Sequence, residues 1–355
     1  MNPAQLKKTT AKTSRVSRKL RRRFDFTQSA MPAAVTELLA LSVPLRGSKL
    51  RVASRREAER CRSAGVPLRG SKLRVASGRE AIAPSLLTWF EVIGYTVLLE
   101  PNIALGKHQI GRSSYSGVVL YQRLHSALQK INPTKSDEAI AAAIHQVTYT
   151  ESSDLPKNNC RFHKFLTNGV EVEYLYNEEI VHDKVWLIDP SNLLNNDWLA
   201  IHPFSVVEGS YAHCPDVVVF INGLPLAVIV SIQPSDEQST FKEGYQQIQT
   251  YCQQIPKLFS YNTFLVITYG NRARIGTLTS DWEEFLPWGT IDGEDFPAKS
   301  ATELEVLIQG IFDKRRFFEL VKHFVVFESN EIRITKKLLR RPFCTIPNSN
   351  KTFNY

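Results

Sequence analysis

The sequence of 355 residues lacks any run of 18 or more apolar residues, and no apolar segment follows its basic N-terminus. These absences exclude a membrane-spanning helix and a secretory signal, so we expect a cytoplasmic protein without membrane contact. The five cysteines lie far apart without a CxxC pair, which excludes a zinc ribbon. A phosphate-binding loop is also lacking, because Gly106-Lys107 has neither the upstream glycine nor the hydroxyl residue that follows the lysine. We therefore expect that the chain does not bind ATP.

Acidic residues are scarce in the first 79 residues, which hold 20 Lys and Arg against 4 Asp and Glu. This segment has a net charge of +16, and residues 80–355, with 24 basic and 31 acidic residues, have a net charge of −7. The overall charge of +9 therefore comes from the N-terminal arm, residues 1–79. Such an arm would bind phosphate without sequence preference.

The arm contains twelve residues twice without a change, at Val43–Ser54 and at Val66–Ser77. Repeat architectures need at least three diverged copies with an apolar stripe, and this pair of basic copies has neither. Perfect identity favours a recent duplication or translated repetitive DNA, and a basic DNA-binding arm is the alternative. We expect the arm to be disordered or foreign to the rest of the chain.

From residue 80 the 43% of hydrophobic residues fall into periodic patterns that predict a packed domain over 80–335, followed by an unpatterned tail at 336–355. Helices are predicted at 82–93, 120–131, 137–147, 241–255, 304–312 and 314–324, with Gly94 ending the first and Ser136 capping the third. Strands are predicted at 95–99, 170–176, 185–188, 204–207, 216–221, 226–232, 264–268 and 274–278. This order predicts an α/β fold with a central mixed sheet flanked by helices.

The strongest local signal is a hairpin. Residues 216–221 and 226–232 are almost entirely apolar, and they flank the sequence Asn222-Gly-Leu-Pro225. Asn and Gly tolerate the positive φ angles of a tight turn. Because both strands are apolar on both faces, we expect them in the middle of the sheet.

The segment from Cys214 to Ile229 resembles the nuclease signature of type I restriction enzyme R subunits, which reads Pro-Asp, an apolar strand, Asn-Gly-Leu-Pro-Leu and a second strand ending in Glu-x-Lys. Further similar segments extend over about residues 80–335, among them Asn159–Gly169 and Asn195-Asn196-Asp197. The resemblance implies a restriction-endonuclease-like PD-(D/E)xK core. In that family the Asp and the Glu hold Mg²⁺, and the Lys places a positive charge near the scissile phosphate.

By this resemblance Asp216 is the catalytic and metal-binding aspartate, but Val230 and Ile232 stand where the family has Glu and Lys. Two of the three catalytic positions are thus lost. Asp236 and Glu237 follow Pro234 and are the alternative source of a compensating carboxylate.

The resemblance also assigns catalytic roles to Gln247 and Tyr251, which match the Gln-x-x-x-Tyr motif of the family and share one helix face. An acidic residue on the first helix is usual in such nucleases. Its position falls near Ala83 in this sequence, and Glu80 is the nearest candidate.

The sequence thus predicts the DNA endonuclease domain of a type I restriction-modification system, truncated before the ATP-dependent motor and catalytically impaired. The expected partners are DNA and the methylase and specificity subunits, and Mg²⁺ is the cofactor that the family would use. A non-catalytic module that docks on DNA or on those subunits is an alternative, and a decayed gene fragment is another.

Limited proteolysis tests the predicted domain limits. Residues 1–79 should be removed first and a fragment of residues 80 to about 330 should persist, because the apolar periodicity is confined to that fragment. Mass spectrometry of the fragments provides the measurement. A stable fragment that retains both copies of the twelve-residue repeat would contradict the prediction.

Overall fold

The computed structural model describes residues 83–100, 114–176, 179–232, 241–292, 301–330 and 333–339. The arm with its repeats, Glu80, Gly106-Lys107, Asp236-Glu237 and residues 340–355 lie outside the described residues. Within the described part, no helix is both long and apolar enough to span a bilayer.

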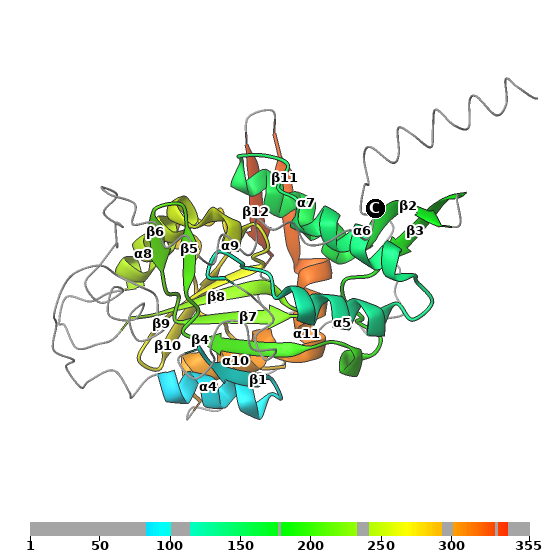
Figure 1. Ribbon diagram of the computed structural model, residues 1–355. Coiled ribbons are helices and arrows are strands. Elements are labelled where there is room, and N and C mark those ends of the chain that lie inside the picture. Colours follow the sequence, from blue (N-terminus) through cyan, green and yellow to red (C-terminus); the bar gives the residue numbers. More distant parts are fainter. Residues whose placement is uncertain are drawn as a thin grey trace, which may run out of the picture. The chain divides into compact units, whose positions relative to one another are not determined.

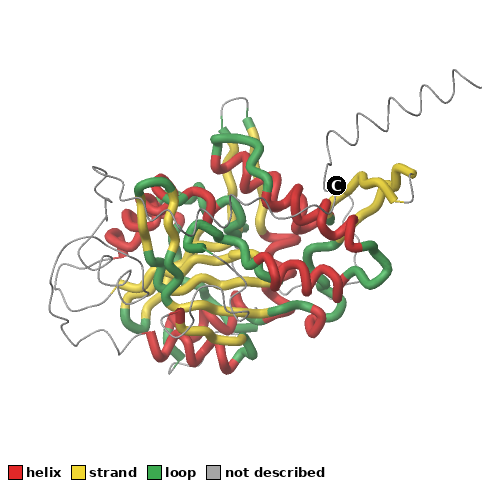
Figure 2. Tube along the Cα trace, in the orientation of Figure 1, coloured by secondary structure: helices red, strands yellow, loops and turns green. Residues whose placement is uncertain are grey.

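The core of the molecule is a six-stranded mixed sheet (Figures 1 and 2). Its strand order is β1-β4-β7-β8-β9-β10; the first and fourth neighbouring pairs are parallel and the other three are antiparallel. The strands are β1 (Thr96–Leu99), β4 (Trp198–His202), β7 (Val217–Ile221), β8 (Leu224–Ile232), β9 (Phe264–Tyr269) and β10 (Arg272–Gly276). The predicted α/β fold with a mixed sheet is confirmed, and the hairpin strands β7 and β8 are its two central strands.

Helices cover both faces of this sheet. Helix α8 packs on β8 and β9. The opposite face carries aromatic side chains of α11, since Phe317 meets Phe264 and Trp198 edge-on. The helices of the core are α4 (Ala83–Val92), α8 (Phe241–Gln254), α9 (Pro256–Phe259), α10 (Glu303–Phe312) and α11 (Lys314–Glu319), which a π-helical turn at Leu320–Phe324 extends.

A second group of elements begins with α5 (Tyr121–Ile131), α6 (Asp137–Thr148) and α7 (Leu155–Asn168) and continues into the hairpin β2 (Val170–Tyr176) and β3 (Glu179–Val185). Ser136 caps α6 as predicted, by accepting a hydrogen bond from the backbone N–H of Ala139. The shorter elements are η2 (Leu193–Asn195), β5 (Val206–Glu208), β6 (Tyr211–His213), η3 (Trp282–Glu284), β11 (Val325–Ser329) and β12 (Ile334–Leu338).

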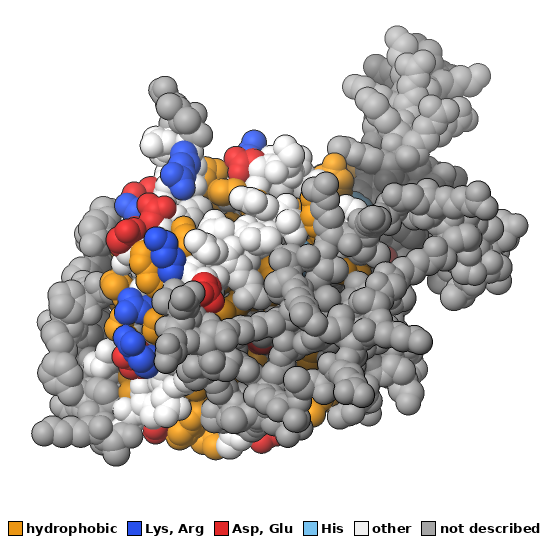
Figure 3. Space-filling view, turned by 90° about the vertical axis from the view of Figure 1, so that its left-hand side faces the viewer, with side chains coloured by type: hydrophobic (Ala, Val, Ile, Leu, Met, Phe, Trp, Pro, Cys, Tyr) orange, Lys and Arg blue, Asp and Glu red, His pale blue; other side chains and the backbone are white. Residues whose placement is uncertain are grey.

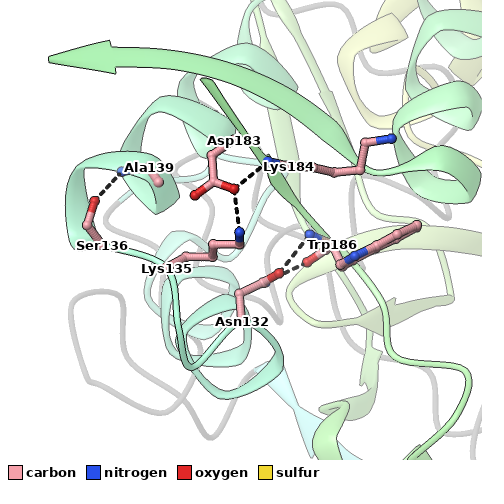
Figure 4. Close-up of polar contacts among 7 residues, drawn as sticks. All are labelled: Asn132, Lys135, Ser136, Ala139, Asp183, Lys184 and Trp186. Atoms are coloured by element: carbon pink, nitrogen blue, oxygen red, sulfur yellow. Dashed lines mark hydrogen bonds and ion pairs between the residues drawn. The ribbon is translucent and has the colours of Figure 1, made fainter. Parts of the chain in front are cut away.

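The predicted strand at 185–188 is wrong, because β3 ends at Val185. At Trp186 the backbone N–H and carbonyl form hydrogen bonds with the side chain of Asn132 and not with a neighbouring strand. The Asn132 amide accepts a hydrogen bond from the Trp186 N–H and donates one to the Trp186 carbonyl, both at 2.9 Å (Figure 4). Beside it Lys135 donates to Asp183, and this hydrogen bond holds the pKa of the Asp183 carboxyl below its ordinary value. The turn between α5 and α6 therefore holds the β2–β3 hairpin.

Several other predicted bounds need correction. The strand predicted at 274–278 lies at Arg272–Gly276. The strand predicted at 204–207 begins only at Val206. The helix predicted at 314–324 is α11 followed by the π-helical turn. Strand β12 reaches Leu338, past the predicted domain limit at residue 335, because Lys336 pairs with Phe327 across the hairpin.

The turn of the β7–β8 hairpin is tighter than predicted and is buried. Only Asn222 (φ 53°) and Gly223 (φ 77°) form it, and Leu224 and Pro225 already belong to β8. The Asn222 side chain donates to the Leu187 carbonyl at 2.8 Å and accepts from the Asp197 N–H at 2.7 Å. The turn thus fastens the loop that enters β4 as well as joining two strands.

A glycine is required at 223 for two reasons. Its φ is positive, and a Cβ there would lie 2.6 Å from the Leu120 carbonyl oxygen and 2.8 Å from the Leu124 nitrogen. The Gly223 carbonyl also accepts a hydrogen bond from the Leu120 N–H at 2.9 Å, next to the start of α5. The hairpin turn and α5 are therefore in backbone contact.

Replacing Gly223 by Ala should destabilise the protein by about 3 kcal/mol or more, because strain from positive φ adds to a clash with backbone atoms. Gly270 is the matched control, since its φ is +58° and nothing lies within 4 Å of an added Cβ. Gly270→Ala should cost only about 1 kcal/mol. Urea unfolding of the two variants measures the difference, and equal losses would contradict this account of the turn.

Candidate active site at the Asp216 edge of the sheet

One edge of the central sheet gathers the predicted site residues. Strands β4, β8 and β9 end there and β7 begins there, as the pairing directions require. The register pairs Val217 with Ile229, so the residue before β7, Asp216, lies opposite Val230. Paired residues of neighbouring strands project to the same face, so Asp216, Val230 and Ile232 share one face of the sheet.

The Asp216 carboxylate is bound to backbone. The residue is only 6% exposed, and its Oδ2 accepts a hydrogen bond from the Ser231 N–H at 2.8 Å. Its main-chain oxygen lies 2.5 Å from Nδ1 of His202, at the end of β4. A carbonyl oxygen only accepts, so this contact places the proton on Nδ1 of His202. Asp216 thereby ties β7 to both of its neighbouring strands.

Val230 and Ile232 belong to a packed apolar layer beneath α8. Val230 is fully buried and Ile232 is 7% exposed. On the next strand they pair with Ile267 and Tyr269. Helix α8 comes close at Gly244, where a Cβ would lie 2.4 Å from Cγ2 of Ile267 and 3.2 Å from Cγ1 of Ile232. The helix thus closes over the two positions where the motif would have a carboxylate and an ammonium.

Gln247 and Tyr251 meet on α8, as their spacing predicts. Nε2 of Gln247 donates to the Tyr251 hydroxyl at 2.5 Å, and the Tyr251 side chain is buried. The Tyr251 ring packs against the ring of His213, with centroids 5.0 Å apart. Nε2 of His213 in turn lies 2.6 Å from Oε1 of Gln254.

His213 therefore connects the segment that leads to Asp216 with the Gln247 and Tyr251 pair on α8. It is fully buried in β6, three residues before Asp216, and it touches the aromatic residue of the Gln-x-x-x-Tyr motif. The sequence gives no strong signal for this role, because a lone histidine has no motif spacing. Its position just before the Pro-Asp pair is the signal that could have suggested it.

A second residue that the sequence analysis missed is Glu100. It follows β1, is 4% exposed, and its Oε2 accepts a hydrogen bond from the Ser205 N–H at 2.6 Å. Since β1 runs parallel to β4, Glu100 lies at the same edge of the sheet as His202. The family position of a first-helix acid falls near Ala83, which begins α4, and its nearest candidate, Glu80, lies outside the described residues.

The described residues of this edge do not fit a divalent cation. Mg²⁺ needs several oxygen ligands in near-octahedral geometry. Val230 and Ile232 offer none, and one oxygen of each carboxylate at this edge, Asp216 and Glu100, already accepts a backbone hydrogen bond. Among the described residues, no group of three or more His, Cys, Asp or Glu side chains is placed to hold a metal.

Comparisons with known proteins agree on one family. The family model for the type I restriction enzyme R protein N terminus matches residues 80–284. The type I restriction enzyme HindI endonuclease subunit of Haemophilus influenzae is 30% identical over 250 residues, which make up 70% of this chain and 24% of that protein. The MjaIXP protein of Methanocaldococcus jannaschii is 29% identical over 243 residues, 63% of this chain and 23% of that protein. The chain thus spans about a quarter of the length of these relatives.

Substitutions at Asp216 should separate a structural role from a chemical one. Asp216→Ala leaves the Ser231 N–H without its acceptor in a buried place and should lower the free energy of unfolding by roughly 1–3 kcal/mol. Asp216→Asn keeps an oxygen acceptor and should cost less. Urea unfolding at neutral pH measures both variants. If Asn is as costly as Ala, the hydrogen bond to Ser231 is not what holds Asp216.

Proposed function

Because this chain belongs to the family of type I restriction enzyme R protein N-termini, we propose that it is the endonuclease-type domain of such a subunit and that its own site cannot cleave DNA. The observation that carries the proposal is the register of β7 and β8, which sets Asp216 opposite Val230. Phosphodiester hydrolysis by the family motif needs a metal-binding carboxylate and a cation beside Asp216. Val230 and Ile232 supply neither.

Val230 and Ile232 should have a much larger effect on the rate of DNA cleavage than on the stability of the fold. If the missing carboxylate and ammonium each contribute only about 3 kcal/mol to the transition state, the rate falls by roughly 10⁴-fold. The fold, by contrast, does not suffer, because replacing buried charges by packed hydrophobic side chains is often neutral or stabilising. Both side chains are well buried in the apolar layer under α8.

We propose DNA and the other subunits of a restriction complex as partners, with the methylase and specificity subunits as the specific candidates. The relatives support this in name only, since the HindI relative is described as a subunit. The described part of the face in Figure 3 gives DNA binding no strong electrostatic support. On the face shown in Figure 3, the described Lys and Arg side chains lie among Asp, Glu and hydrophobic side chains and do not form one continuous basic patch.

A second candidate function is a non-catalytic docking module within such a complex. The observation in its favour is that buried polar groups at both ends of β7 have hydrogen-bond partners, Asn222 in the turn and Asp216 at the candidate site. A decayed gene fragment with no function is the remaining alternative. Co-purification with methylase and specificity subunits encoded nearby would support the docking module and count against decay.

We expect no nicking of supercoiled plasmid by the purified chain with Mg²⁺ or Mn²⁺, because Val230 and Ile232 supply neither the carboxylate nor the cation of the family motif. The Asp216→Ala variant is the control for traces of a contaminating nuclease. Cleavage that disappears with Asp216→Ala would show that another group, such as Asp236 or Glu237, has replaced the missing ligand. The proposal of an inactive site would then fail.

The double substitution Val230→Glu and Ile232→Lys should restore a metal-binding edge. The buried charges should lower the melting temperature without metal, and Mg²⁺ or Mn²⁺ should raise it again because only the folded protein binds the ion. The matched control is Val230→Gln with Ile232→Met, which has similar shapes and no charges. Calorimetry should show that either single change, or the double change combined with Asp216→Ala, binds no metal.

A further inference from the structure

Lys336 is a lysine buried in the domain core. It is 1% exposed, lies in β12 and pairs with Phe327 of β11. The β11–β12 hairpin stands beside α7 (Figure 1), with which β12 is in contact. Lysine is almost never fully buried unless it is paired, so the surroundings of this side chain need an explanation.

The Lys336 side chain enters a cage of neutral groups. Its Nζ donates to Oδ1 of Asn159, on α7, at 3.0 Å and to the main-chain oxygen of Asn262, before β9, at 2.6 Å. Nδ2 of Asn159 also donates to the Asn262 oxygen and to the Phe259 carbonyl, which fixes the orientation of the amide. The centroid of the Phe327 ring lies 5.4 Å from Nζ of Lys336, which sits over the face of the ring.

This cage matches a neutral amine better than an ammonium. A neutral amine has two N–H groups, and the cage supplies two oxygen acceptors. For the third N–H of an ammonium the described residues supply no further oxygen acceptor, and Lys336 has no ion pair among them. The Phe327 ring offers an ammonium only a cation–π contact. Burial accordingly lowers the pKa of Lys336 to about 7.

The two titratable neighbours of Lys336 do not outweigh its burial, since Cys160 raises the pKa of Lys336 by less than burial lowers it. They are Cys160 and His163, both on α7. Burial, together with the charge of Lys336, lowers the pKa of His163 to about 3, so its ring is neutral around pH 7. The other elements that reach Lys336 contribute amide, hydroxyl and aromatic groups.

The same residue docks the hairpin through its backbone. The carbonyl of Lys336 accepts hydrogen bonds from the hydroxyls of Thr277 and Thr279, at 2.7 and 2.9 Å, in the segment between β10 and η3. Its N–H donates to Oγ1 of Thr279 at 2.7 Å. One residue therefore joins β12 to α7, to the start of β9 and to the end of β10.

We propose that the β11–β12 hairpin is a pH-dependent latch, which Lys336 closes on α7 and the β10–η3 segment as a neutral amine and loosens when it takes up a proton. The latch is distinct from the Asp216 edge, since Lys336 contacts the beginning of β9 while Asp216 lies at the end where β9 terminates. It also lies beyond residue 284, where the match to the family model ends.

The sign of the effect follows from the two protonation equilibria. An undocked hairpin exposes Lys336 to water, where a lysine titrates near its ordinary pKa of about 10.4. Docking lowers this pKa, so docking is weakest below pH 7, where both states are protonated. As the pH rises from about 7 toward 10, docking strengthens by up to about tenfold per pH unit.

Hydrogen exchange of the full chain between pH 6.5 and 9 tests the latch. Protection factors of the amides in Val325–Ser329 and Ile334–Leu338, corrected for intrinsic exchange, should rise with pH by up to about tenfold per unit above pH 7. Lys336→Met should abolish this slope. Lys337→Met is the matched control, because Lys337 is the next residue and is exposed and paired with Glu328, so that variant should keep the wild-type slope.

A measurement on the unaltered protein covers the case in which Lys336→Met does not fold. Nitrogen NMR of ¹⁵N-labelled lysine should show one side chain that titrates near pH 7 and is assigned to Lys336 through its contact with the Phe327 ring. All lysines titrating above pH 9 would overturn the proposal. A hairpin protection that stays constant with pH in the wild type, or an equal slope in Lys336→Met, would overturn it as well.

Discussion

The structure depends on the antiparallel pairing of β7 with β8, which the buried Asn222–Gly223 turn closes. The turn sets the pairing next to it, and a register shift between Val219 and Phe220 then brings Asp216 opposite Val230. The resulting register decides which side chains share a face. A slip of one residue would take Asp216 away from Val230 and turn the apolar side chains of β8 to the other face. The same turn meets the start of α5 through the Gly223 carbonyl and the loop before β4 through Asn222. One short segment thus positions the sheet, the first helix of the second group and the candidate site.

The features that could be predicted from the sequence are those with a local cause. The Asn-Gly pair between two apolar runs predicts the central hairpin, and a 3.6-residue apolar period predicts α8. The features that could not be predicted depend on partners far along the chain. Trp186 does not continue strand β3, because the side-chain amide of Asn132, 54 residues earlier, forms hydrogen bonds with its backbone. The predicted tail at 336–355 begins within β12, because the burial of Lys336 depends on α7, which lies far earlier in the chain.

In the candidate site, too, some residues could be predicted from a local pattern, whereas others depend on partners far along the chain. The positions of Asp216, Val230 and Ile232 follow from the motif resemblance together with strand periodicity, and the structure places all three on one face. The sequence also predicts that Gln247 and Tyr251 meet on one helix. Glu100 and His213 could not be predicted from the sequence. Glu100 reaches the site only through the strand order β1-β4-β7-β8, and His213 reaches it only through packing against α8. The catalytic assignments of the motif residues stay predictions, whereas their proximity is a property of the fold.

An apolar side chain would affect the stability of the fold differently at the three motif positions 216, 230 and 232. At 230 and 232, Val and Ile are buried side chains without polar atoms, so the proposed exchange of charges for methyl groups is compatible with a stable core. At 216 an apolar side chain would leave the Ser231 N–H without its acceptor, at a cost of roughly 1–3 kcal/mol. The aspartate therefore has a structural reason to remain that does not depend on metal or DNA. On the proposal that the edge has lost the Glu and the Lys of the motif, this asymmetry gives a physical reason why Asp216 remains and the domain still folds.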